Sequence, residues 1–68
     1  MKIEKIDLVM VMSLLADLAA HNGPDETLIW AGQIADAILS DNVVRLHTVN
    51  FALAQRLVEM QEAADAEA

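Results

Sequence analysis

The chain has 68 residues, of which 56% are hydrophobic and only 3% aromatic, and it carries a net charge of −7. A chain this short forms one domain at most and buries a small fraction of its surface alone. Eleven acidic residues against four basic ones argue against nucleic acid or an anionic membrane as a partner. The absence of cysteine excludes disulfide bonds and thiolate metal sites.

The apolar residues are mainly Ala, Leu, Val, Ile and Met, a mixture that favours helices. We therefore predict an all-α fold. A small chain with more apolar surface than its own core can cover usually hides the surplus in an oligomer or against a partner. The composition thus predicts a homodimer.

The first helix is predicted over about residues 3–20, and it ends at His21-Asn22-Gly23-Pro24. Its apolar residues cover roughly half the circumference, wider than the ~100° stripe of an ordinary surface helix. It is shorter than the ~20 residues that cross a membrane and it contains Asp7 and Asp17. We expect a helix of a cytoplasmic protein, with no membrane contact.

The second helix is predicted to begin at Pro24, a residue well suited to the first helical position. Asp36 is expected on its polar side, with Ile29 exposed beside it. Trp30, at the edge of the apolar side, either anchors a partner or closes the helical hairpin. Six residues are predicted to form the buried side: Leu28, Ala31, Ile34, Ala35, Ile38 and Leu39.

Ser40-Asp41-Asn42 predict a turn before a third helix over about residues 43–63, because these residues favour helix caps. The alternative is one long helix over residues 24–63, which would give a two-helix hairpin. Residues 1–63 are interpreted as one helical domain. Residues 64–68 are expected to be a frayed acidic tail, since acids are unfavourable at a helix C-terminus.

Residues 43–64 carry an apolar stripe with three- and four-residue spacing, which we call the Asn50 stripe. Its members are Val43, Leu46, Asn50, Leu53, Leu57, Met60 and Ala64. This heptad pattern is typical of a helix that packs on another helix, and it predicts a dimeric helical bundle, parallel or antiparallel. The predicted dimer interface consists of Leu46, Asn50, Leu53, Leu57, Met60, Leu14 and Leu18.

Asn50 interrupts the stripe with a polar side chain. Two Asn50 side chains could meet across the dimer axis and fix its register, or Asn50 could lie at the margin and bond to water or backbone. Phe51, next to the stripe, is expected in the core. Arg45 and Arg56 are expected to form intrahelical ion pairs, with Glu59 as a candidate, and the alternative is that they pair with an acidic patch on a partner.

No motif in the sequence indicates catalysis, a cofactor or a metal. His21 and His47 lie on different predicted elements without carboxylates at a ligand spacing, and a metal site needs three or four converging ligands. No nucleophile-and-base pattern or glycine-rich phosphate loop is present. A non-enzymatic protein is therefore predicted.

The small size, the Asn50 stripe and acids such as Asp36, Glu59 and Glu62 resemble the small acidic helical proteins that phages and mobile elements encode to disable host factors. These include quorum-sensing anti-activators, which occupy the DNA-binding region of a transcription regulator, and anti-CRISPR proteins. The resemblance implies a homodimer that binds and blocks a host protein with a basic surface. We expect Trp30, Ile29 and Asp36 to contact that target. The alternative is a structural or antitoxin-like dimerisation module.

Overall fold

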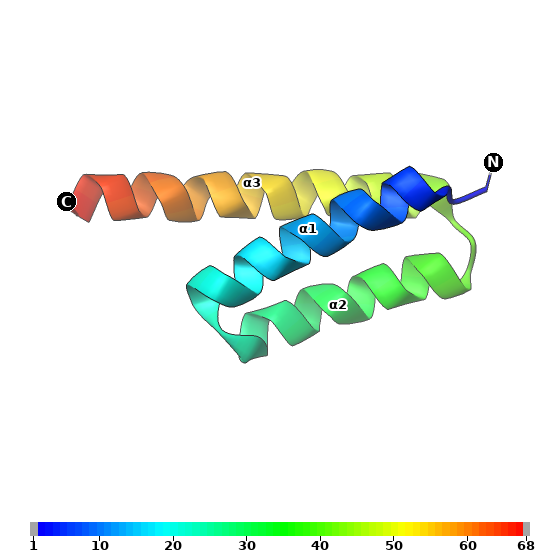
Figure 1. Ribbon diagram of the computed structural model, residues 1–68, viewed down its shortest axis with the longest axis horizontal. Helices are drawn as coiled ribbons and strands as arrows, with labels where there is room; N and C mark the ends of the chain where they lie inside the picture. Colours follow the sequence, from blue (N-terminus) through cyan, green and yellow to red (C-terminus); the bar gives the residue numbers. More distant parts are fainter. Residues whose placement is uncertain (1, 68) are drawn as a thin grey trace.

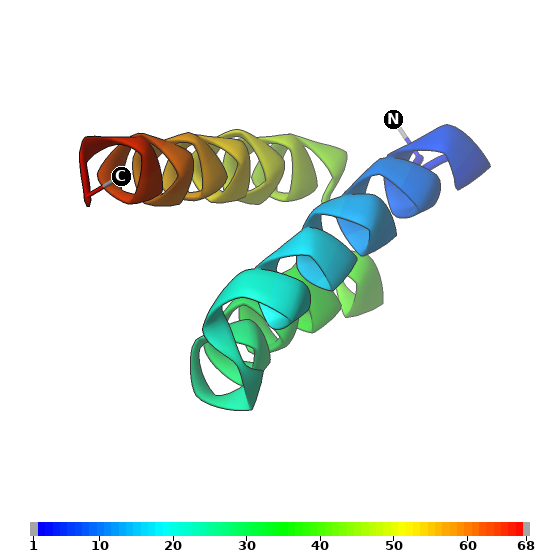
Figure 2. The same cartoon turned by 60° about the vertical axis from the view of Figure 1, so that its left-hand side comes forward.

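The computed structural model describes residues 2–67, with the side chains of residues 2–66. The chain forms α1 (Lys5–Asn22), α2 (Pro24–Leu39) and α3 (Val43–Glu67). This confirms the predicted all-α fold with three helices and excludes the continuous helix over residues 24–63. In Figure 1, α1 and α2 form an antiparallel hairpin beside α3, and Figure 2 shows that the hairpin crosses α3 at an angle.

Local chemistry sets each helix boundary. At the start of α1, the Glu4 backbone N–H donates a hydrogen bond to Asp7 Oδ2 at 2.9 Å. Gly23, with φ of 80°, ends α1, and Pro24 begins α2. Asn42 caps α3, because its Oδ1 accepts a hydrogen bond from the backbone N–H of Arg45 at 3.1 Å. The predicted breaks at residues 22–24 and 40–42 are therefore confirmed.

The core lies where the three helices meet, and each helix contributes to it. Its buried members are Val11 and Leu18 of α1, Ile34 and Ala37 of α2, and Leu46, Val49 and Leu53 of α3. Every pair of helices is in contact. The α1–α2 hairpin and α3 therefore form one packing unit.

The buried side of α2 is rotated from the predicted one. Ile34 is buried as predicted and Ala31 is half-buried, but the other predicted members are exposed: Leu28, Ala35, Ile38 and Leu39. Leu28 is 69% exposed and Leu39 is 86% exposed, whereas Ile34 and Ala37 are buried. Trp30, Ile34 and Ala37, spaced four and three residues apart, form the side that packs inward. Apolar residues occur on both sides of α2, so the sequence pattern did not determine which side is covered.

The C-terminal part of α3 extends past the α1–α2 hairpin (Figure 1). A helix of 25 residues is ~37 Å long, and the whole chain is 43 Å in its longest dimension. The helix continues to Glu67, beyond its predicted end at residue 63, because Ala63, Ala64 and Ala66 favour helix and no Gly or Pro interrupts them. Ala68, the last residue of the predicted tail, lies outside the described residues.

Candidate protein-binding surfaces

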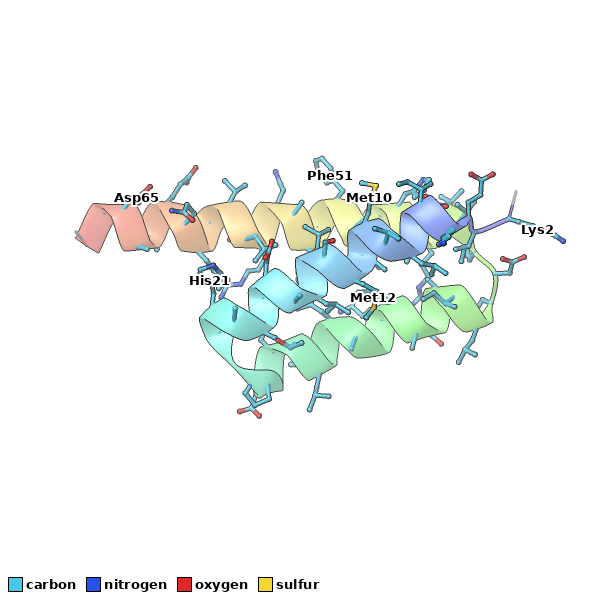
Figure 3. All side chains as sticks on the ribbon, viewed as in Figure 1. Lys2, Met10, Met12, His21, Phe51 and Asp65 are labelled. Carbon is cyan, nitrogen blue, oxygen red and sulfur yellow. The ribbon has the colours of Figure 1, made fainter. Side chains whose placement is uncertain are left out.

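A groove runs between α1 and α3, and we call it the α1/α3 groove. It has a volume of about 690 Å³ and is lined mainly by apolar side chains, among them Val9, Met10 and Leu14 of α1 and Asn50, Phe51 and Ala54 of α3. Val9 and Met10 are each about half exposed, and Phe51 is 68% exposed. In Figure 3, Met10 and Phe51 project from the two helices on the same side of the molecule.

The position of Phe51 corrects the sequence prediction, which placed this ring in the core. Phe51 belongs to a second stripe of α3, one residue out of phase with the Asn50 stripe. We call it the Phe51 stripe: Val44, His47, Phe51, Ala54 and Val58. Val44, Phe51 and Val58 are spaced by seven residues and are 67%, 68% and 56% exposed. One face of α3 therefore packs inside the chain, and a neighbouring face with a heptad spacing remains open.

Asn50 lies at the boundary between these two stripes. It is only 8% exposed and also lines the α1/α3 groove. Within the described residues, its buried Oδ1 has no hydrogen bond partner. A buried carbonyl without a donor costs ~1–3 kcal/mol, so an unsatisfied polar group lies enclosed in the wall of this groove.

One end of the α1/α3 groove is closed by a polar pair. His47 Nε2 lies 2.9 Å from Asp7 Oδ1, and both residues line the groove. The pKa of Asp7 is lowered, first by the hydrogen bond from the Glu4 backbone N–H and then by His47. Asp7 therefore holds the start of α1 and joins α1 to α3 with the same carboxylate.

A second exposed surface lies on α2, facing away from the core. We call it the outer α2 face: Asp25, Leu28, Ile29, Gly32, Asp36 and Leu39, all exposed and spaced to lie on one side of the helix. Leu28 and Ile29 are 69% and 64% exposed. A Cβ added at Gly32 would meet no atom within 4 Å, so the middle of this face is open. The surface combines apolar side chains with carboxylates at both ends.

The structure separates the three residues predicted to contact a target. Ile29 and Asp36 lie on the outer α2 face, and the exposure expected for Ile29 is confirmed. Trp30 is half-buried and packs against the core, which matches the alternative that it closes the helical hairpin. Its ring is therefore a smaller part of the accessible surface than the sequence position suggested.

The residues predicted to form the dimer interface lie inside a single chain. Leu18, Leu46 and Leu53 are 0% exposed, and Asn50 is 8% exposed. The remaining predicted interface residues, Leu14, Leu57 and Met60, pack partly buried against the same core. The helices that cover the central part of the Asn50 stripe are thus α1 and α2 of the same chain, whereas Leu14, Leu57 and Met60 keep part of their surface accessible.

The two arginines of α3 form ion pairs with α2, so the intrahelical pairs predicted for them are wrong. Arg45 Nη2 lies 3.2 Å from Asp36 Oδ2. Arg56 donates hydrogen bonds to both carboxylate oxygens of Glu26, at 3.1–3.3 Å. The hydrogen bond from Arg56 lowers the pKa of Glu26, and the same contact raises the pKa of Arg56. These pairs fasten α2 to α3 at both ends.

Among residues 2–67, no cluster of three or more His, Asp or Glu side chains could hold a metal ion. His21 and His47 lie at different places on the molecule, His21 beside a hollow between the end of α1 and α3, and His47 in the α1/α3 groove. No helix in this part of the chain combines the length and the apolar character needed to span a bilayer.

Comparison with protein-family models, with curated proteins and with solved structures found no match.

Proposed function

We propose that this chain is a non-enzymatic protein-binding protein that acts as a homodimer and blocks a partner protein. One observation carries the proposal: at least eleven large apolar side chains of the described residues are exposed. Single exposed apolar residues are ordinary, but six of these eleven gather at helical spacing, three on the Phe51 stripe and three on the outer α2 face. Contiguous apolar surfaces of this kind mark sites of protein association.

The total surface supports the same proposal. The chain exposes 4759 Å², whereas a compact monomer of 7.4 kDa is expected to expose roughly 4,200 Å². The surplus of about 550 Å² approaches the ~800 Å² per partner that a standard protein interface covers. Covering one such interface would bring the exposed area of the chain close to that expected for a compact protein of its mass.

Charge suggests the chemistry of the partner. The outer α2 face has carboxylates at both ends of an apolar patch, and Asp36 is paired with an arginine of its own chain while remaining 65% exposed. Together with the net charge of −7, this face fits a partner with apolar residues surrounded by Lys and Arg. The DNA-binding region of a transcription regulator has this character, and the resemblance to phage anti-activators leads to the same partner class.

A matched pair of variants tests target binding. Tagged wild-type chain, Ile29→Asp and Val58→Asp would each be used to capture partners from a host lysate at low and moderate salt. Ile29→Asp should fail to capture the partner that the wild-type chain captures. Once purified, that partner should no longer bind DNA when the wild-type chain is added. Recovery of no specific partner at either salt concentration would contradict the proposal.

The exposed heptad on α3 also favours a second candidate, a structural or antitoxin-like module whose only role is helix pairing. In that case Ile29→Asp would leave every interaction intact, and Val58→Asp would abolish assembly. The two variants therefore separate the candidates, because one surface is altered in each.

A further inference from the structure

We propose that a second copy of this chain docks on the α1/α3 groove, with the two α3 helices antiparallel and a two-fold axis near Phe51. This inference rests on the proposed homodimer and identifies the surface that forms it. The surface lies beside the Asn50 stripe and shares only Asn50 with it, because Leu46 and Leu53 of that stripe are buried inside one chain. It also leaves the outer α2 face free for a target.

The first argument is the spacing of the exposed residues. Val44, Phe51 and Val58 follow each other at intervals of seven residues, or ~10.5 Å along the helix axis. An antiparallel pair of α3 helices with Phe51 at the centre places Val44 of each chain opposite Val58 of the other. All three exposed positions would then be covered at once by the same residues of the second copy.

The second argument is that this face is complementary to itself. Phe51 protrudes, and the neighbouring hollow is lined by Met10, Leu14 and Ala54. A two-fold axis brings the same surface patch of both chains together, so that each protruding ring meets the hollow of the other chain. The small side chain of Ala54 leaves room there for an aromatic ring.

Asn50 supplies the third argument. Its buried Oδ1 lacks a hydrogen bond donor among residues 2–66, and its neighbour in the sequence is Phe51, the residue at the proposed axis. Oδ1 is enclosed within the chain, so pairing across the axis requires the amide to turn outward when the second copy binds. Two carboxamides, each with a donor and an acceptor, can then satisfy each other. Polar pairs of this type fix the register of helix dimers.

The charge distribution selects the antiparallel arrangement. The far end of α3 carries Glu59, Glu62 and Asp65, all exposed. The opposite end lies near the exposed Lys2 and Lys5, because the N-terminal segment reaches the start of α3, where the Ile3 N–H donates to Asp41 Oδ1 at 3.4 Å. Lys2 and Lys5 are balanced there by the exposed Glu4 and Asp41, so this end is close to neutral. Antiparallel packing separates the two acidic ends and places each one toward a nearly neutral end of the other chain. Parallel packing would place acid against acid.

Cysteine cross-linking tests the arrangement directly, because the natural chain has no cysteine. Val44→Cys and Val58→Cys would be prepared separately and treated with a bismaleimide that spans ~8 Å. In the proposed dimer, equal positions are ~21 Å apart along the axis, so each variant alone should give little covalent dimer. A mixture of the two should give abundant covalent dimer. Efficient cross-linking of either variant alone would overturn the antiparallel arrangement.

Solution mass tests the surface itself. Phe51→Asp should raise the dimer dissociation constant by about 30-fold or more, while Ile29→Asp on the outer α2 face should leave it unchanged. Circular dichroism would verify that both variants are helical, and Val58→Asp provides a second variant if Phe51→Asp unfolds. A dimer unaffected by both Phe51→Asp and Val58→Asp would overturn this inference while the proposed homodimer stands. A monomeric wild type would overturn both this docking surface and the proposed homodimer. The lysate capture with Ile29→Asp would still test target binding through the outer α2 face.

Discussion

His47 Nε2 lies 2.9 Å from Asp7 Oδ1, although 40 residues separate the two in the sequence. This contact joins the start of α1 to α3 at one end of the α1/α3 groove. Because the pKa of Asp7 is lowered from 3.8, the folded state binds its proton less readily than the unfolded state. Asp7 therefore contributes stability that is present above about pH 4, near its pKa in the unfolded chain. This stability is lost as the pH falls through the lower pKa that Asp7 has in the folded state.

Replacing Asp7 with Asn should lower stability at neutral pH and weaken the dependence of stability on pH in the acid range. Some dependence should remain, because Arg56 also lowers the pKa of Glu26. Urea unfolding between about pH 7 and pH 3 measures this change. Asp65→Asn, on the exposed end of α3, should follow the wild-type curve. The proposed role of Asp7 would be refuted if its variant also followed that curve.

Truncation of Leu53 and truncation of Phe51 should lower stability with a different dependence on protein concentration. Leu53 is 0% exposed, so Leu53→Ala should lower the free energy of unfolding by about 2–5 kcal/mol at any protein concentration. Phe51 is exposed, so Phe51→Ala should have a small effect on the isolated chain and a larger one at concentrations where the dimer forms. Thermal unfolding at several concentrations distinguishes the two. A concentration-independent loss for Phe51→Ala would place that ring in the core.

Asn50→Leu should raise the stability of the isolated chain by about 1–3 kcal/mol, because it removes a buried carbonyl that has no donor in the described part of the chain. At high concentration, the same variant should form a dimer with a less defined register. Asn50→Ala is the control, since it removes the same group and leaves a cavity. Chemical unfolding of dilute samples gives the first quantity. A less stable Asn50→Leu would show that the native amide is satisfied within the monomer.

Gly23 and Gly32 provide a matched pair of glycine substitutions. Gly23 has a φ of 80°, a left-handed conformation that strains other residues, so Gly23→Ala should destabilise the chain by about 1–2 kcal/mol. Gly32 lies within α2, where an added Cβ meets nothing within 4 Å, so Gly32→Ala should stabilise it by about 0.5–1 kcal/mol. Thermal unfolding of both variants measures the difference. Equal effects would contradict the assigned helix boundary.

The number and type of the elements could be predicted from the sequence, because local residues determine them. Gly23-Pro24 ends one helix and starts the next, and Asn42 caps the third. The Asn50 stripe correctly indicated a face of α3 that packs against helices. A heptad pattern shows that a face is covered, but not whether the covering helices belong to the same chain.

The rotation of α2 and the position of Phe51 could not be predicted by the same reasoning. With 56% hydrophobic residues, both α2 and α3 carry apolar side chains on more than one face. Leu28 and Leu39 look like core residues by type, yet the smaller Ala37 faces inward. The seven-residue spacing of Val44, Phe51 and Val58 was a visible signal, but it lay beside the stronger Asn50 stripe.

The central claim, that this chain acts through association of its exposed helical surfaces, is tested most directly by sedimentation equilibrium of the wild type from about 1 µM to 500 µM. We predict a mass that rises from that of one 7.4 kDa chain to about twice that value. A stable, helical monomer over the whole concentration range would contradict the account.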